Sequence, residues 1–371
     1  MNPAFLPAET VKKRRLPLFA KIFFGIFLVS LVLYIAFLFS ETFSDFFNRT
    51  IASAVRAVLA RLTGWIPFSL AEYLLLMIPV ILVVLVGIGF RRFSDSWRDV
   101  FVYSGSILSV AAMVFAVFAF GFAPAYRGTT LDRKLGIERR DVSAEELKQT
   151  ALILAEALNS EAGAIGYDPT TDFSVMPYNY DEMNDRLLAA YDKACDKYPF
   201  VQRLNSRLKP VMLSEAMSYT HITGVYSFFT GEANINVAFP DYTVPYTAAH
   251  ELSHQRGIAR EDEANFMAFL VCLESDDAYI RYSGHLNLYE YVMSALYSAS
   301  PEMYSEIYGK APMRVRSEMA AYSEFFNKYR DSVASEVSGA VNNTFLTLHG
   351  TEGTRSYGMV VDLAVAYYLP R

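Results

Sequence analysis

The sequence has few cysteines, little charge and no basic stripe, and these shortages narrow the class of protein. Two cysteines in 371 residues leave Cys195 and Cys272 either as one disulfide or as two buried thiols. A net charge of −6 without a basic stripe gives no reason to expect nucleic-acid binding. Charged residues reach only 19%, whereas hydrophobic residues reach 53% and the mean hydropathy is +0.20, which is too apolar for a typical soluble protein.

The hydrophobic residues are concentrated in three long runs, at 22–39, 74–90 and 101–126. A helix needs roughly 20 residues to cross about 30 Å of hydrocarbon. The runs therefore predict transmembrane helices at about 19–40, 70–90 and 101–124. The first run is longer than the core of a secretory signal and has no small-residue cleavage site, so we expect a retained anchor.

Lysine and arginine beside the runs indicate the orientation, because cytoplasmic loops are enriched in both. Basic residues precede the first run and fill the short turn between the second and third: Lys12, Lys13, Arg14, Arg15, Lys21, Arg91, Arg92 and Arg98. We therefore expect a multi-pass cell-membrane protein with a cytoplasmic N-terminus and an extracytoplasmic C-terminal domain. Basic residues after 126 oppose this orientation, but long translocated domains largely escape the rule.

Two domains are expected, a membrane domain at 1–126 and an extracytoplasmic domain at 127–371. Within the first, apolar residues recur at helical spacing between 43 and 63 and predict an amphipathic helix in the interface plane or over the bundle. In the second, Ser143 and Glu146 form a capping-box pattern before one amphipathic helix, and another helix is expected over 181–198.

The fold expected for the second domain is mainly helical, of the α+β kind, with a small sheet ahead of a histidine-bearing helix. One or two strands are predicted between 207 and 240, including "ANINVAF" at 233–239, and helices follow almost to the end after 261. The strand at 232–239 could serve either as an ordinary sheet strand or as an edge that pairs with an extended substrate.

The segment "VPYTAAHELSHQRG", residues 244–257, carries the main functional signal. Pro245 suits the first turn of a helix and Gly257 suits its end, so both ends are marked. On that helix His250 and His254 are four residues apart and share one face, where both rings can hold one ion. Glu251 lies about 100° around the helix, so its carboxylate can reach a water beside the metal without binding the metal itself.

A catalytic zinc site generally has three protein ligands, so a third must be found. Gly257 can reverse the chain and return the acidic residues of "AREDEANF" to the histidines. Glu261 and Glu263 are about 200° apart on a helix, so at most one of them faces the ion. We favour Glu261, because Asn265 one turn later could orient its carboxylate; Glu263 and a remote residue are the alternatives.

The sequence "HELSH" followed by "GIAREDEANF" resembles zinc metallopeptidases of the gluzincin type, in which a glutamate on the next helix completes the site. The resemblance implies a zincin-like fold for the second domain, with His250, His254 and Glu261 as zinc ligands and Glu251 as general base. The order of three spans, "PFSLAEYL" and "AAHELSHQRGIAREDEANF" is similar to a bacterial membrane family catalogued as domain of unknown function 3810. This second resemblance covers most of the chain and implies no substrate.

These observations predict a membrane-anchored metallopeptidase that hydrolyses a peptide or protein substrate with a zinc-activated water. Tyr219, His221, Tyr282 and His285 are candidates for stabilising the oxyanion. Two other functions fit the same residues. One is a membrane sensor or scaffold with a non-catalytic metal site, and the other is a zinc amidase that acts on cell-wall material.

Overall fold

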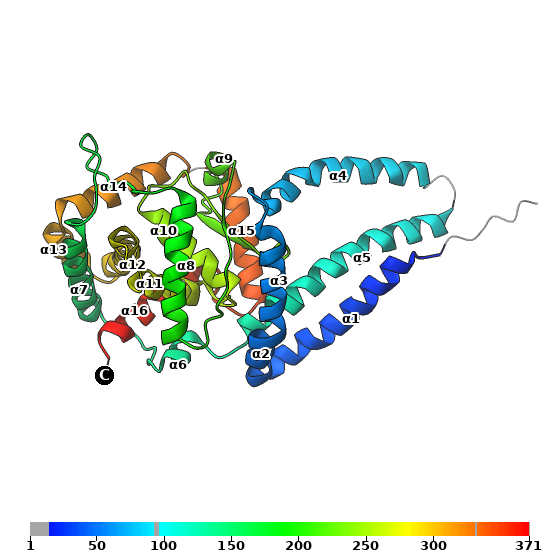
Figure 1. Ribbon diagram of the computed structural model, residues 1–371, viewed down its shortest axis with the longest axis horizontal. Helices are drawn as coiled ribbons and strands as arrows, with labels where there is room; N and C mark the ends of the chain where they lie inside the picture. The colour runs from blue at the N-terminus through cyan, green and yellow to red at the C-terminus, as the bar shows by residue number, and fades with distance from the viewer. Residues whose placement is uncertain (1–14, 93–95, 331, 371) are drawn as a thin grey trace, which may run out of the picture.

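The computed structural model describes residues 15–92, 96–330 and 332–370, and it is elongated, with long apolar helices at one end and a helical domain at the other (Figure 1). Three helices are long and apolar enough to cross a membrane: α1 (Leu18–Phe39), α4 (Leu70–Arg92) and α5 (Trp97–Gly121). They confirm the three runs expected from the sequence. Lys12, Lys13 and Arg14 lie outside the described residues.

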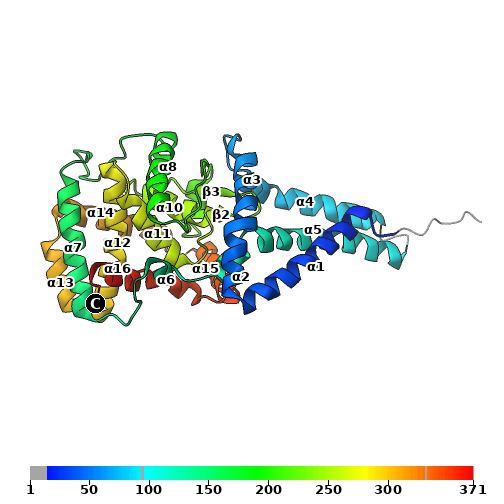
Figure 2. The same ribbon diagram turned by 60° about the horizontal axis from the view of Figure 1, so that its bottom comes forward.

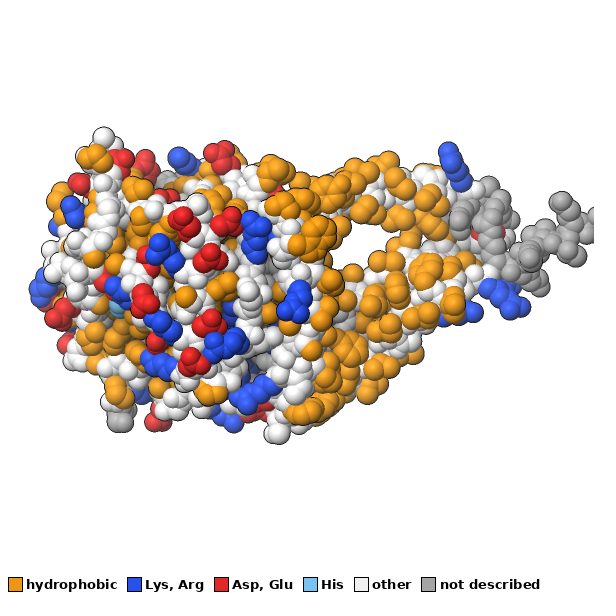
Figure 3. All heavy atoms as spheres, in the orientation of Figure 1, with side chains coloured by type: hydrophobic (Ala, Val, Ile, Leu, Met, Phe, Trp, Pro, Cys, Tyr) orange, Lys and Arg blue, Asp and Glu red, His pale blue; other side chains and the backbone are white. Residues whose placement is uncertain are grey.

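The three apolar helices are not one tight bundle. Helices α1 and α5 pack against each other through aromatic rings, with Phe27 and Tyr34 of α1 at 5.4 and 5.7 Å from Phe115 of α5. Helix α4 contacts α5 through the hydroxyl of Tyr103 and the carbonyl of Leu85, but over part of its length the space-filling view shows an opening between the two helices (Figure 3). Apolar side chains cover these helices, whereas charged side chains gather on the helical domain (Figure 3). Such a surface suits a lipid environment.

The segment expected at 43–63 is helical and packs firmly on the domain. It comprises α2 (Glu41–Phe47), a π-helical turn η1 (Asn48–Ala52) and α3 (Ser53–Gly64). Arg56 of α3 is only 1% exposed and donates hydrogen bonds to Asn48, to the carbonyl of Gly121 and to the side chain of Gln202. Because a buried guanidinium must be satisfied on several sides, these bonds join α3, α5 and the domain into one unit.

The domain is mainly helical, as expected. Ser143 and Glu146 form the predicted capping box at the start of α7, and the second predicted helix is α8. The helices are α6 (Leu131–Leu135), α7 (Ala144–Ala162), α8 (Tyr180–Lys197), α9 (Ser214–Ser218), α10 (Thr243–Gln255), α11 (Glu261–Leu273), α12 (Ala278–Ala299), α13 (Pro301–Lys310), α14 (Met313–Asn327), α15 (Val333–Leu348) and α16 (Val360–Tyr368), with 3-10 turns η2 (Ala123–Tyr126) and η3 (Gly353–Met359).

The small sheet has three short strands, β1 (Leu208–Pro210), β2 (Gly224–Ser227) and β3 (Glu232–Ile235), in the order β1-β3-β2. Strand β3 pairs in parallel with β1 and antiparallel with β2, so both of its edges are occupied. The idea that the strand at 232–239 pairs with a substrate is therefore wrong. Strand β2 lies at an edge of the sheet instead.

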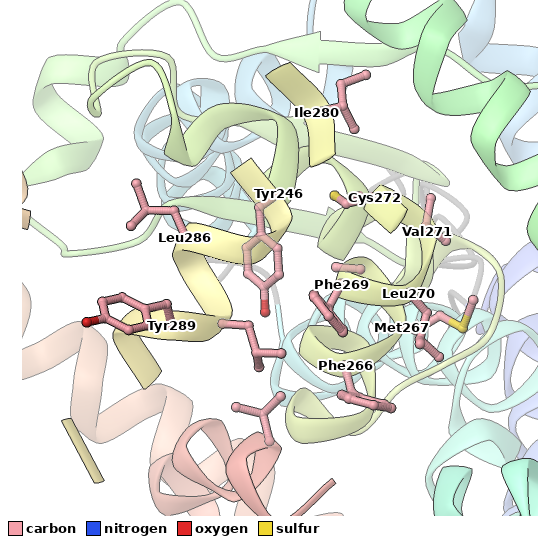
Figure 4. Close-up of a cluster of buried hydrophobic side chains, with 14 of the residues drawn as sticks. Tyr246, Phe266, Met267, Phe269, Leu270, Val271, Cys272, Ile280, Leu286 and Tyr289 are labelled. Atoms are coloured by element: carbon pink, nitrogen blue, oxygen red, sulfur yellow. The ribbon is translucent and has the colours of Figure 1, made fainter. Parts of the chain in front are cut away.

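The core of the domain surrounds α10, α11 and α12, which lie side by side in both views (Figures 1 and 2). Every residue of α10 is buried, and so is α11 from Glu261 to Cys272. Side chains such as Phe266, Phe269 and Leu286 fill the space between the helices (Figure 4). Helices buried on all sides cannot shift without opening cavities, which costs several kcal/mol per large side chain.

The two cysteines do not pair. Cys195 and Cys272 are both free, and Cys272 lies within the core among the side chains of α11 (Figure 4). Burial raises the pKa of both thiols. Both thiols therefore stay protonated and serve as packing groups in this fold. Of the two alternatives, a disulfide or two separate thiols, the structure has two separate thiols.

Candidate metal centre

Helix α10 presents His250 and His254 on one face, and the turn after it brings an acid to them. The two imidazole rings lie 4.5 Å apart and nearly perpendicular. Gly257 has a φ of +85°, a conformation that side chains rarely adopt, and a Cβ there would meet the guanidinium of Arg56. The side chain of Asn48 donates to the carbonyl of Gly257 at 3.0 Å, so the turn is held from outside. Glu261 then stands at the first position of α11.

The three side chains have the separations of ligands around one ion. Oε2 of Glu261 lies 3.1 Å from Nε2 of His250 and 3.4 Å from Nε2 of His254. Zinc bonds of about 2.1 Å at tetrahedral angles place neighbouring ligand atoms about 3.4 Å apart. Oε2 of Glu261 is buried, and the ligand atoms that the three side chains offer all lie within 4.8 Å of one another. The group could therefore hold a metal ion.

The environment of His254 prepares its ring for that role. Nδ1 donates to the carbonyl of Ile258 at 2.8 Å, and because a carbonyl only accepts, the lone pair of the neutral ring is left on Nε2. Burial by itself would lower the pKa of His254, but the carboxylate of Glu261 raises it to about 9. Burial likewise opposes ionisation of Glu261, yet the two histidines hold its pKa well below the usual range. The site therefore combines a fixed anion with two imidazoles.

Glu251 lies beside the three potential ligands but is not one of the group. It is only 3% exposed, and its Oε2 has no hydrogen-bond partner among the described residues. Burial raises the pKa of Glu251 to about 7, although His250 and His254 act in the opposite direction. Gly224 of β2 makes room for this carboxylate, since a Cβ there would lie 2.5 Å from Oε1. A carboxylate with a pKa near neutrality can both accept and return a proton.

The site opens onto a cleft of about 420 Å³. His250 and Glu251 form part of its wall, together with the residues that lead into β2 and one face of α15. The residues that line this cleft also include His221, Gly224, Tyr246, Asn265, Tyr291, Ser335, Ser338, Gly339 and Asn342. A cleft of this size accommodates a few residues of an extended chain.

Glu263, the alternative third ligand, is turned away from the histidines. Its Oε1 accepts from the backbone nitrogen of Leu131 at 3.0 Å and from Arg260 at 3.2 Å, so it links α11 to α6. Asn265 does not orient Glu261 as expected. Its side-chain nitrogen is buried and has no hydrogen-bond partner among the described residues, while its carbonyl accepts from the hydroxyl of Tyr246.

The four aromatic candidates for oxyanion stabilisation have other contacts. His221 lines the cleft, but its Nε2 lies 2.7 Å from the carbonyl oxygen of Tyr329, and Tyr219 packs on the ring of Tyr329. His285 is engaged with Glu161 at 2.8 Å. Tyr282 is fully buried in the core. Of these four, only His221 is among the residues that line the cleft with Glu251.

Tyr291 on α12 is a cleft residue that sequence reasoning missed. It shares the cleft wall with His250 and Glu251. Burial raises its pKa, and the negative charge of Glu261 raises it further, so its hydroxyl stays protonated and available as a donor. No motif marks Tyr291, because only the packing of α12 against α10 brings it to the site.

The fold and the site define a membrane-associated, mainly helical protein with a buried group of two histidines and one glutamate that could hold a metal ion. The family model described as "Protein of unknown function (DUF3810)" matches residues 47–365, and the chain belongs to this family. The match runs through α3, two of the apolar helices and nearly the whole domain. No curated protein and no solved structure matches the chain.

Proposed function

We propose that this protein is a membrane-anchored zinc metallopeptidase whose domain lies outside the cytoplasm. The observation that carries the proposal is the convergence of His250, His254 and Glu261 beside the buried carboxylate of Glu251, at the wall of a cleft. A purely structural metal site has no need for a buried carboxylate that is not a ligand or for a cleft next to it. Two imidazoles and one carboxylate are the ligand set of peptide-cleaving zinc sites.

Zinc, when bound to this set, would lower the pKa of a coordinated water and polarise a carbonyl group. The chain's own residues would do the rest. Glu251 would take a proton from the attacking water, and it would then give that proton to the leaving amine. Burial keeps the pKa of Glu251 above that of an ordinary carboxyl group, which favours holding the proton between the two transfers.

Two further groups fit peptide hydrolysis. The neutral hydroxyl of Tyr291 could donate to the oxygen that becomes negative during attack. Strand β2 lies at the edge of the sheet and begins at Gly224, directly against Glu251. An extended substrate could add to this edge, since backbone hydrogen bonds place a peptide without regard to its sequence.

The test uses the full chain, purified in detergent and loaded with zinc. Bound metal is measured first, and a quenched-fluorescence peptide library is then offered to the wild type and to Glu251→Gln. The wild type should cleave some peptides, whereas Glu251→Gln should bind the same amount of zinc and turn over about 100-fold to 10,000-fold more slowly. If both proteins bind the same amount of zinc and neither cleaves a peptide, the result would support a scaffold. If only cell-wall fragments are cleaved, the result would support an amidase.

A further inference from the structure

Helix α15 exposes a line of large apolar side chains, although Leu346 on its other side is buried. Its inward face carries Ser335, Ser338, Gly339 and Asn342, which line the metal cleft. Its outward face carries Val333, Val337, Val341 and Leu348, which are 73%, 59%, 66% and 69% exposed. The spacing of four, four and seven residues places these side chains in one stripe along the helix. In water this stripe would leave large apolar side chains exposed to solvent.

The C-terminal end of α15 lies at the depth of the apolar helices. His349, which follows α15, contacts the rings of Phe118 in α5 and Tyr34 in α1 at 4.8 and 6.4 Å. Phe345 of α15 also contacts Phe118, at 6.0 Å. Tyr34 is five residues before the end of α1, which corresponds to about 7 Å along the helix. This end of α15 therefore lies beside the last turns of α1 and α5.

The segment before α15 is linked to the start of α4 indirectly, through residues on either side of α9. Tyr329, just before α15, packs on Tyr219 with ring centres 4.8 Å apart. Tyr219 follows α9, and the backbone nitrogens of Met212 and Leu213 before α9 donate to the carboxylate of Glu72 in the first turn of α4. The 16 residues of α15 span about 24 Å. The helix therefore runs between the ends of the apolar helices, across the side of the domain from which these helices leave (Figures 1 and 2).

The composition of α15 suits a lipid surface rather than a protein partner held by charge. Glu336 is the only charged residue between Val333 and Leu348. It lies outside the valine stripe on the helical wheel. Other exposed apolar side chains continue the surface towards α4, among them Met212 and Trp65, which are 77% and 78% exposed. Tryptophan is enriched at the boundary between lipid and water, so this surface continues that of the apolar helices.

We infer that α15 rests on the lipid surface through its valine stripe, and that the cleft on its inner face takes polypeptide segments held close to the bilayer. The first part depends only on the exposed stripe of α15 and on the contacts that Phe345 and His349 make with α1 and α5. The second part names the substrate class and rests on the proposed peptidase function. A juxtamembrane stretch of a membrane-anchored protein has the chemistry that such a cleft would receive.

The lipid contact is tested in the full chain, reconstituted into phosphatidylcholine vesicles. A fluorescent probe that reports polarity is attached through Val341→Cys, and in a matched control through Ser298→Cys on α12, both in a Cys195→Ser background with Cys272 left buried. The Val341 probe should be quenched by brominated lipid and shielded from iodide, whereas the Ser298 probe should show the reverse. Equal quenching of the two probes by iodide would refute lipid contact. Shielding of the Val341 probe from both quenchers would identify a protein partner or second copy on the stripe, which also overturns the inference.

The substrate class is tested with one cleavable sequence from the peptide library, anchored in the same vesicles. The sequence is placed either about 5 or about 20 residues from the anchor, reaching about 17 or 70 Å when extended. The near site should be cleaved at least as fast as the far site, because the cleft wall lies at the lipid surface. Cleavage of the far site alone would overturn this part. If neither anchored nor free peptide is cleaved, the peptidase proposal fails, while the fluorescence result still decides where α15 lies.

Discussion

Gly224 at the start of β2 offers a test of Glu251 that leaves every potential ligand untouched. A Cβ at this position would lie 2.5 Å from Oε1 and 2.7 Å from Cγ of Glu251. Carbon atoms in contact are about 3.5 Å apart, so Gly224→Ala must displace the Glu251 side chain by about 0.8 Å or more. Because Glu251 is buried, it has little room to move without leaving the position from which it could reach a water.

A displacement of about 1 Å in a catalytic group costs about 100-fold in rate. We therefore expect Gly224→Ala to lower kcat on a library peptide by about 100-fold and to leave zinc content unchanged. Gly163→Ala is the matched control, since a Cβ at Gly163, at the end of α7, meets nothing within 4 Å. Full activity of Gly224→Ala would refute the role of Glu251, and parallel loss of zinc would show that the substitution acts through the fold instead.

The remaining predictions concern the site and its support. Glu261→Gln should lower zinc affinity by more than about tenfold, whereas Glu263→Gln should retain zinc, as measured by metal content after dialysis; equal retention would contradict the ligand assignment. Burial raises the pKa of Glu290 to about 8. The folded protein therefore keeps a proton that the unfolded chain releases above about pH 4.5, so the free energy of unfolding should fall as the pH rises from 5 to 8. Glu290→Gln should flatten this fall in thermal melts, and an unchanged slope would exclude Glu290 as its source. Arg56→Leu should lower the free energy of unfolding by about 3 kcal/mol, because it leaves buried oxygens unpaired. Arg56→Lys should be similarly destabilised, because one ammonium cannot replace three separate guanidinium contacts. A melting midpoint equal to that of the wild type in either Arg56 variant would count against this network.

Most of the local structure could be predicted from sequence. The apolar runs predicted α1, α4 and α5 within a few residues, since length and hydropathy alone decide whether a helix suits a bilayer. The capping box at Ser143 predicted the start of α7, because Ser143 and Glu146 satisfy each other's backbone within one turn. The spacing of His250 and His254 predicted a shared face of α10, because helix geometry is the same in every protein.

Features that depend on distant contacts could not be predicted. Strand β3 looked free to pair with a substrate, but β1 and β2 occupy its two edges. Tyr291 and Gly224 come to the site from α12 and β2 without any local signal. The exposure of the valine stripe of α15 could not be predicted either, because a helix with one apolar face is expected to turn that face inward.

The sequence by itself determined the three apolar helices, the helical ends around the histidines and the set of acids from which a third ligand could come. Only the tertiary structure decided among those acids. The turn at Gly257, held by Asn48 of η1, brings Glu261 to the histidines, while the backbone of Leu131 engages Glu263. The physical reason is one of range. Helix geometry and hydropathy act over a few residues, whereas the direction of a carboxylate depends on partners more than 100 positions away along the chain.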